Sequence, residues 1–117
     1  MIKIYNSNIQ DFTSYSNNVP IYKGSVLENP FSVGKRNSSV TKTFSSKDEM
    51  MNAFRLYFQQ MYENNILFKE YVDIIYDKYK HGEDIYFQDF CEPNDSHGNI
   101  IINELQKKLI KESIKHK

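Results

Sequence analysis

The feature that most constrains the fold is an apolar segment, residues 85–91, that leads through a polar turn straight into a helix. In an extended chain Ile85 and Phe87 point to one side, and Tyr86 and Phe90 point to the other. Apolar side chains on both sides are typical of a central strand covered on both faces. The segment therefore predicts an α/β fold in which a strand end and a helix start meet at one sheet edge.

Length and composition narrow the class of protein. The chain has 117 residues, the size of one ordinary domain, and we predict a single domain over residues 1–117. Lys and Arg total 15 and Asp and Glu total 15, so the formal charge is zero and bulk nucleic-acid binding is not expected. The single cysteine excludes an intramolecular disulfide, and no long apolar run marks a signal peptide or a membrane span. We expect a cytoplasmic protein with no membrane partner.

The remaining extended segments complete a short sheet of about three to five strands. Residues 1–5 and 19–23 are the first two predicted strands, and Pro20 restricts the second to a strand start or a sheet edge because proline lacks an N–H. Residues 24–36 predict an ordered loop, since they hold two glycines and an Asn-Pro pair. Residues 40–44 are extended or irregular.

Three amphipathic helices are expected to flank this sheet, near residues 46–63, 66–81 and 97–115. A capping box at residues 46–49 marks the first start, and His81-Gly82 marks the second end. Aromatic residues at helical spacing are interpreted as core. The predicted core is Ile21, Phe54, Phe58, Met61, Val72, Ile75, Ile85, Phe87, Ile101 and Leu105.

The nine tyrosines exceed what one small core needs. We expect part of this surplus on the surface, where aromatic side chains favour interfaces, and a homodimer is the assembly it suggests. The tyrosines concerned are Tyr15, Tyr22, Tyr62, Tyr71, Tyr76 and Tyr86.

The polar turn and helix start after the central strand form the first half of a candidate site. Pro93 fixes the turn, and Gly98 lets a ligand approach backbone N–H groups that lack partners within the helix. A phosphate or carboxylate suits that geometry, and His97 adds a donor. The alternative is that Asp95 or Ser96 only caps the helix and His97 is a surface residue.

The loop at residues 24–36 forms the second half. Lys35 and Arg36 would neutralise an anion, and Phe31 or Tyr22 would stack on a planar base. The alternative is that Phe31 packs into the core and the cations remain in water. A nucleotide or a sugar phosphate is the predicted ligand class. The predicted ligand-binding residues are Gly24, Asn29, Phe31, Lys35, Arg36, Cys91, Ser96, His97 and Gly98.

Two separated motifs carry a resemblance to a known family. Residues 24–31 read Gly-Ser-Val-Leu-Glu-Asn-Pro-Phe and precede a Gly-Lys pair, and residues 89–98 read Asp-Phe-Cys-Glu-Pro-Asn-Asp-Ser-His-Gly. They resemble the Gly-Ser-Pro-Leu-Gly-Asn-Pro-Phe loop and the Cys-aromatic-Cys-x-Pro-x-x-Cys-His-Gly motif of an uncharacterised bacterial and phage family, domain of unknown function 4326. The order and spacing agree from Val19 onward. The resemblance implies a small α/β domain with one site made by both loops, and no established activity.

The chain departs from the family motif at two cysteine positions, which hold Asp89 and Ser96. Cys91 and His97 remain, too few for a closed tetrahedral metal site, so neither a metal nor another cofactor is expected. Cys91 itself is interpreted as a small buried hydrophobe rather than a nucleophile.

Three classes of function stay open. The favoured one is a domain that binds a nucleotide-derived or sugar-phosphate anion, and the phage side of the resemblance suggests a counter-defence protein that sequesters a signal nucleotide. The second is an enzyme that cleaves or modifies a glycosidic or phosphate bond of a nucleotide, with Asp89, Glu92 or Asp95 as acid or base and His97 as proton carrier. The third is an oligomeric interaction protein without a small ligand.

Overall fold

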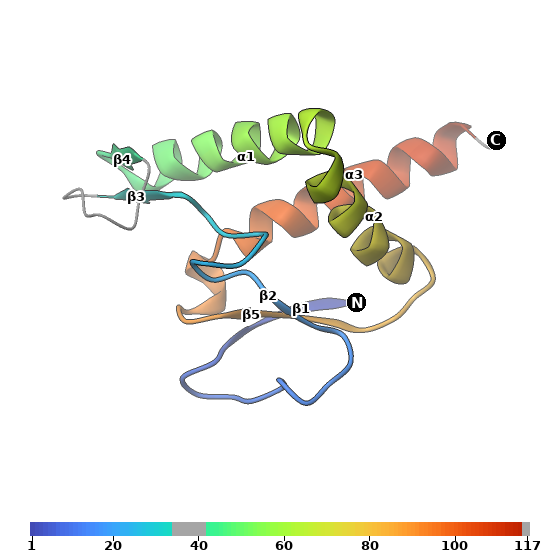
Figure 1. The fold of residues 1–117 in the computed structure, drawn as a ribbon, viewed down its shortest axis with the longest axis horizontal. Coiled ribbons are helices and arrows are strands. Elements are labelled where there is room, and N and C mark those ends of the chain that lie inside the picture. Colours follow the sequence, from blue (N-terminus) through green and yellow to red (C-terminus); the bar gives the residue numbers. More distant parts are fainter. Residues whose placement is uncertain (34–41, 116–117) are drawn as a thin grey trace.

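A three-stranded parallel sheet lies beneath three helices (Figure 1). The computed structural model describes residues 1–33 and 42–115. The sheet holds β1 (Ile2–Asn6), β2 (Asn18–Pro20) and β5 (Ile85–Asp89) in the order β1-β5-β2. The predicted central strand is therefore confirmed as β5, and Pro20 lies on an edge strand as expected. Because both neighbours run parallel to β5, the carboxyl ends of all three strands meet at the same edge.

The two faces of the sheet are covered by different parts of the chain. The register aligns Ile4 with Phe87 and Phe87 with Val19, so these residues share the face that packs against the helices. The opposite face carries Tyr5 and Gln88, and residues 7–17 cover it, because the ring of Phe12 lies 5.1 Å from that of Tyr5. Both faces of β5 are thus covered, as the apolar residues on its two sides predict.

The helices are α1 (Lys47–Asn64), α2 (Ile66–Lys80) and α3 (Gly98–Lys115), each within about two residues of its predicted bounds. Ser46 caps α1 by accepting a hydrogen bond from the Glu49 N–H at 3.2 Å. Asn65 separates the first two helices and caps α2 through the Phe68 N–H at 3.1 Å. A single 3₁₀ turn, η1 (Pro93–Asp95), lies between β5 and α3.

One short strand pair was not expected. The prediction of a loop throughout residues 24–36 is wrong for β3 (Phe31–Val33), which pairs in parallel with β4 (Lys42–Phe44) beside the start of α1. The physical reason is aromatic packing, since the ring of Phe31 meets those of Phe44 at 5.5 Å and Tyr57 at 5.8 Å. This strand pair holds the end of the loop against α1.

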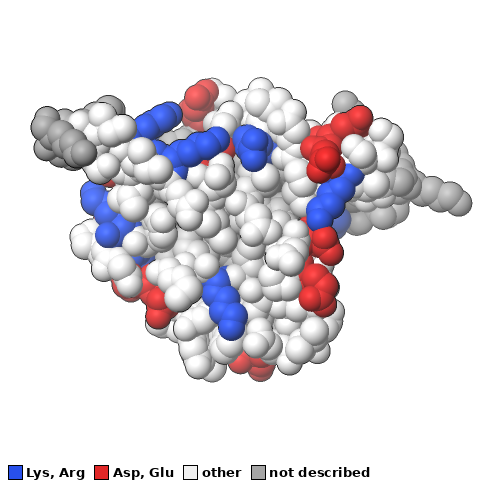
Figure 2. Space-filling view, turned by 180° about the vertical axis from the view of Figure 1, so that it is seen from behind, with Lys and Arg blue, Asp and Glu red and all other residues white. Residues whose placement is uncertain are grey.

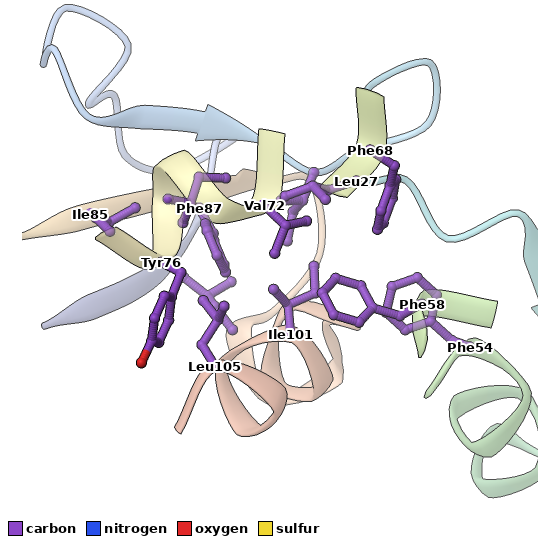
Figure 3. Packing of buried hydrophobic residues seen from close by; sticks show 13 residues of the cluster. Leu27, Phe54, Phe58, Phe68, Val72, Tyr76, Ile85, Phe87, Ile101 and Leu105 are labelled. Carbon is purple, nitrogen blue, oxygen red and sulfur yellow. The ribbon is translucent and has the colours of Figure 1, made fainter. Parts of the chain in front are cut away.

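The core lies between the helices and the sheet, with side chains from every helix and from β5 (Figure 3). Nine of the ten predicted core residues are buried, and Met61 is half-buried at its rim. The chain adds Leu27 from the loop and Tyr76 from α2. The interpretation of Tyr76 as part of the tyrosine surplus is wrong, because the residue is 5 % exposed and its hydroxyl donates to Glu112 at 2.7 Å.

The other tyrosines of that surplus are partly exposed, as expected: Tyr22, Tyr62, Tyr71 and Tyr86 are half-buried. Only Tyr15 among them is classed as exposed, and its ring is perpendicular to that of Tyr86 at 5.0 Å. Basic and acidic side chains are interspersed on the face shown in Figure 2, around a broad uncharged area. None of the helices in the described part of the chain is both long and apolar enough to cross a membrane.

Candidate ligand-binding cleft

An open cleft of about 420 Å³ lies at the sheet edge where the strands end. In Figure 1 this edge is on the left, where β5 gives way to η1 and where β3, β4 and the start of α1 lie. Three segments distant in sequence form its walls: residues 22–33, the first turn of α1 and residues 89–97. Ligands of open parallel sheets bind at this position, outside the carboxyl ends of the strands.

The first wall is the loop that the sequence singles out. Asn29 Oδ1 accepts a hydrogen bond from the Phe31 N–H at 3.0 Å, and this turn directs the loop past the cleft. Lys23 Nζ donates to the Asn29 carbonyl at 2.7 Å, so its ammonium group is held in the same wall. Tyr22 and Phe31 add aromatic surface. Two predicted binding residues, Asn29 and Phe31, therefore face the cleft.

The second wall is the start of α1, which contributes Lys47, Met50 and Met51. Lys47 forms an ion pair with Asp95 of η1, which joins this wall to the third. Both side chains of the pair are well exposed, at 47 % and 63 %. The cleft therefore has a second ammonium group, and its partner is accessible to water.

Asp89 is the centre of the third wall. Its Oδ1 accepts from the Phe90 N–H at 2.9 Å, and its Oδ2 accepts from the Ser96 hydroxyl at 2.7 Å and the Cys91 thiol at 3.5 Å. Residues 89, 91 and 96 are the positions at which the family motif quoted above has cysteine. In this chain they converge as a carboxylate with two donors, and Cys91 and Ser96 both line the cleft.

His97 is a buried wall residue, not the surface residue of the alternative interpretation. Its Nε2–H donates to the Leu27 carbonyl at 2.8 Å, and its ring stands edge-on to Phe54 at 4.8 Å. Burial lowers the pKa of the imidazole below its usual 6.5, against the opposing effects of the Leu27 carbonyl and Asp89. His97 is thus neutral at pH 7, and it ties the loop to the start of α3.

Cys91 is held as a thiol. Burial, followed by the charge of Asp89 and the hydrogen bond to it, raises the pKa of the thiol from the usual 9.0 to about 11. The side chain is only half-buried and does line the cleft. A protonated thiol is a weak nucleophile, which agrees with the interpretation of Cys91 as a residue other than a nucleophile. The expectation that Cys91 is buried is not met, because the side chain is half-buried.

The N–H groups at the start of α3 are not free for an anion, which corrects the predicted cradle. The Ser96 hydroxyl accepts from the Gly98 N–H at 3.0 Å, and the Ser96 carbonyl accepts from the Asn99 N–H at 3.3 Å. The His97 carbonyl accepts from the next two, at 2.9 and 3.4 Å. Of the two capping candidates Ser96 is the cap, because Asp95 turns to Lys47.

The two predicted glycines lie outside the cleft. Gly98 faces the core, where an added Cβ would lie 2.8 Å from the end of Ile21 and 3.0 Å from that of Ile4. Gly24 occupies an exposed turn with φ of +97°, and its N–H donates to Glu28 at 2.6 Å. Both glycines are explained by packing or by backbone conformation, without a ligand.

Lys35 and Arg36, the predicted cations, lie outside the described residues. The structure places two other lysines in the cleft, Lys23 and Lys47, together with Asp89 as the hydrogen-bond centre. Lys23 adjoins the glycine that opens the loop motif, which is the one local signal that could have found it. Within residues 1–33 and 42–115 no group of three or more His, Cys, Asp or Glu side chains is placed to hold a metal.

Comparison with known proteins gives a family and no activity. The family described as Domain of unknown function (DUF4326) matches residues 5–107, most of the chain, and the chain belongs to that family. No curated protein and no solved structure matches it. The matched span includes all three walls of the cleft.

Proposed function

We propose that this protein binds a nucleotide-derived or sugar-phosphate anion in the cleft at the carboxyl edge of its sheet. The observation that carries the proposal is the meeting of two ammonium groups with an aromatic and thioether surface in one cavity of about 420 Å³. Cavities of about 300–1,000 Å³ hold small-molecule ligands, and most are apolar with a few polar groups that fix orientation.

Lys23 and Lys47 are the two lysines that line the cleft, and we assign the anion of the ligand to them. Among the described residues Lys23 has no carboxylate partner and donates to a backbone carbonyl. Lys47 is paired with Asp95, but both groups are exposed, and exposed pairs contribute only about 0–1 kcal/mol. A phosphate can therefore take both ammonium groups at little cost in lost protein contacts.

The aromatic and methionine residues of the cleft lining suit a planar or apolar part of the same ligand. Tyr22 and Phe31 present rings, and Met50 and Met51 present flexible thioethers that adapt to the shape of a ligand. An aromatic ring against a nucleobase contributes about 1–3 kcal/mol by alanine substitution in nucleic-acid complexes. A nucleotide uses these residues and the lysines, whereas a sugar phosphate uses mainly the lysines.

The groups that a nucleophilic enzyme would need are occupied, which favours binding over turnover. Cys91 is a thiol with a pKa of about 11. Ser96 is 2 % exposed and its hydroxyl donates to Asp89. A domain that binds without turnover removes its ligand from solution, so sequestration of a signal nucleotide, as in counter-defence, is the form of function we favour.

Thermal unfolding tests the proposal, since a ligand that binds only the native state raises the melting temperature. The panel is AMP, cyclic AMP, ADP-ribose, ribose 5-phosphate and glucose 6-phosphate, with each mixture analysed for products. The variants are Lys23→Gln and Lys47→Gln. Lys80→Gln is the matched control, because the side chain of Lys80 is about as exposed as that of Lys47, at 48 % against 47 %. Lys80 pairs with Glu112 and does not line the cleft.

The proposal predicts a shift for at least one compound that both cleft variants reduce and the control retains, with the compound recovered intact. Recovery of a product instead would establish an enzyme. No shift with any compound, together with a defined oligomer by light scattering, would contradict the proposal and favour an interaction protein.

A further inference from the structure

We propose that Asp89 accepts a hydrogen bond from a sugar hydroxyl of the ligand, so that the cleft selects phosphate monoesters that carry hydroxyl groups over simple anions. This inference rests on the proposed function and specifies what the cleft discriminates. Asp89 is the last residue of the central strand, and its side chain lines the cleft.

The Asp89 carboxylate has acceptor capacity that the protein leaves unused. Two carboxylate oxygens offer about four lone-pair positions. The described residues occupy three of them: Oδ2 takes the Ser96 hydroxyl and the Cys91 thiol, and Oδ1 takes only the Phe90 N–H. One position on Oδ1 therefore remains for a further donor, and Asp89 lines the cleft in which we place the ligand.

The charge around Asp89 favours a neutral donor. The only basic group within ion-pair distance among the described residues is His97, whose Nδ1 lies 3.8 Å from Oδ2. Its other nitrogen donates to the Leu27 carbonyl, and burial keeps the imidazole neutral at pH 7. A phosphate or carboxylate of a ligand would meet like charge at this point, whereas a hydroxyl hydrogen compensates the buried carboxylate.

Asp89 and Lys23 line the same cleft, which places the two recognition points within one cavity of about 420 Å³. His97 Nδ1 is next to Asp89, and the charge of Lys23 is among the influences that lower the pKa of that ring. A phosphate on Lys23 and a hydroxyl on Asp89 then belong to one small molecule. A ribose phosphate has both groups within a few bonds, whereas inorganic phosphate has no sugar hydroxyl.

Deletion of hydroxyl groups from the ligand tests the inference on the wild-type protein. Calorimetric titrations compare AMP with 2′,3′-dideoxy-AMP, and ribose 5-phosphate with inorganic phosphate. A hydrogen bond to a charged group predicts about 10- to 100-fold weaker binding of the dideoxy nucleotide. The ribose 5-phosphate arm distinguishes a sugar-phosphate ligand from one that needs its base.

Asp89→Asn tests the protein side, with Asp73→Asn as control, because Asp73 pairs with Lys69 on α2 and does not line the cleft. Asp89→Asn replaces the charged acceptor by a neutral amide oxygen and should lower the AMP to dideoxy-AMP affinity ratio severalfold. Asp73→Asn makes the same change of a carboxylate to an amide outside the cleft, so the ratio should persist. If Asp89→Asn weakens both nucleotides equally, Asp89 only positions the turn and the inference is overturned.

The outcomes separate this inference from the function on which it rests. Equal affinity of wild type for AMP and dideoxy-AMP overturns the role of Asp89 while the binding function stands. No binding of any of the four probes overturns both. If Asp89→Asn does not fold, the wild-type comparison alone decides, because it alters only the ligand.

Discussion

Two polar regions lie on opposite faces of the same sheet, and they differ in whether their hydrogen-bond donors and acceptors are all used within the protein. On the face beneath residues 7–17, Tyr5 donates to Asn18, Asn18 donates to Gln88 at 3.0 Å, and Gln88 donates to Ser7 at 3.0 Å. This hydrogen-bonded ladder crosses all three strands. It is covered by the ring of Phe12 and does not line the cleft.

The cleft begins one residue further along β5, on the other face. Gln88 belongs to the ladder and Asp89 to the cleft, because successive side chains of a strand point to opposite sides. In the cleft, Lys23 and Oδ1 of Asp89 have hydrogen-bonding capacity that the described residues do not use. A closed network stabilises the fold, whereas an open one can recognise a ligand, and the predictions below test that distinction.

The largest expected effect concerns His97. It lines the cleft, but its ring is hydrogen-bonded within the protein, as are the side chains of the closed network. His97→Ala removes a ring that packs on Phe54 and leaves the Leu27 carbonyl without its donor. We expect a loss of about 2–4 kcal/mol in the free energy of unfolding, measured by urea denaturation. His81→Ala is the control, with an exposed ring, and should cost little. Equal stability of the two variants would assign His97 to the open region.

The second prediction concerns the reactivity of Cys91. A thiol pKa of about 11 in place of 9.0 implies roughly 100-fold less thiolate in the folded protein than in the unfolded chain. Alkylation by iodoacetamide at pH 8, followed by mass spectrometry, should be slower in buffer than in urea by about that factor. Alkylation in buffer as fast as in urea would show an unperturbed thiol and would contradict the environment assigned to Cys91.

The third prediction is a pH dependence of stability that His97 causes. Burial holds the pKa of its imidazole below 6.5 in the folded state, so between the two pKa values the unfolded chain binds more protons. Stability should therefore fall as the pH drops below about 6.5, by at most about 1.4 kcal/mol per pH unit. Asp73 and Glu112, whose pKa values are lowered, lose their contribution only at more acidic pH.

The control for this pH dependence is His97→Gln, which keeps an amide donor near the position of Nε2 but does not titrate. Denaturation at pH 7.5, 6.5 and 5.5 should give a free energy of unfolding that decreases with falling pH for wild type and decreases less for the variant. The same slope in both proteins would mean that another group causes it.

The smallest expected effect concerns Asp95, which competes with the ligand for Lys47. Asp95→Asn should bind AMP about two- to five-fold more tightly, as expected for removal of an exposed ion pair. Asp73→Asn is the matched control, because Asp73 pairs with Lys69 on the surface of α2. Weaker binding by Asp95→Asn than by the control would show that Asp95 itself holds the ligand.

Local sequence patterns predicted most of the fold. The apolar residues on both sides of β5 identified the central strand, and the cap at Ser46 with the interruption at Asn65 located two helix starts. β3 was missed because its pairing depends on the contact of Phe31 with Tyr57, which lies in a helix distant in sequence. The interpretation of Tyr76 is wrong because its burial depends on a hydrogen bond to Glu112, which lies in another helix and cannot be predicted from the local sequence.

The site was predicted in part. Its loops were identified from their turn residues, and Asn29, Phe31, Cys91, Ser96 and His97 do come together around one cleft. The free N–H groups could not be judged from sequence, because the Ser96 hydroxyl and nearby carbonyls satisfy them only in the folded turn. Lys47 could not be assigned because its place depends on how α1 approaches the sheet.

NMR titration of the ¹⁵N-labelled protein with AMP tests the central claim most directly, because it reports the open and the closed region in one experiment. The account predicts saturable shifts of amide signals from residues 22–33 and 89–97 and from the first turn of α1, with those of Tyr5, Asn18 and Ser7 unchanged. Shifts confined to another surface, or none up to millimolar AMP and ribose 5-phosphate, would contradict the assignment of this cleft as the ligand site.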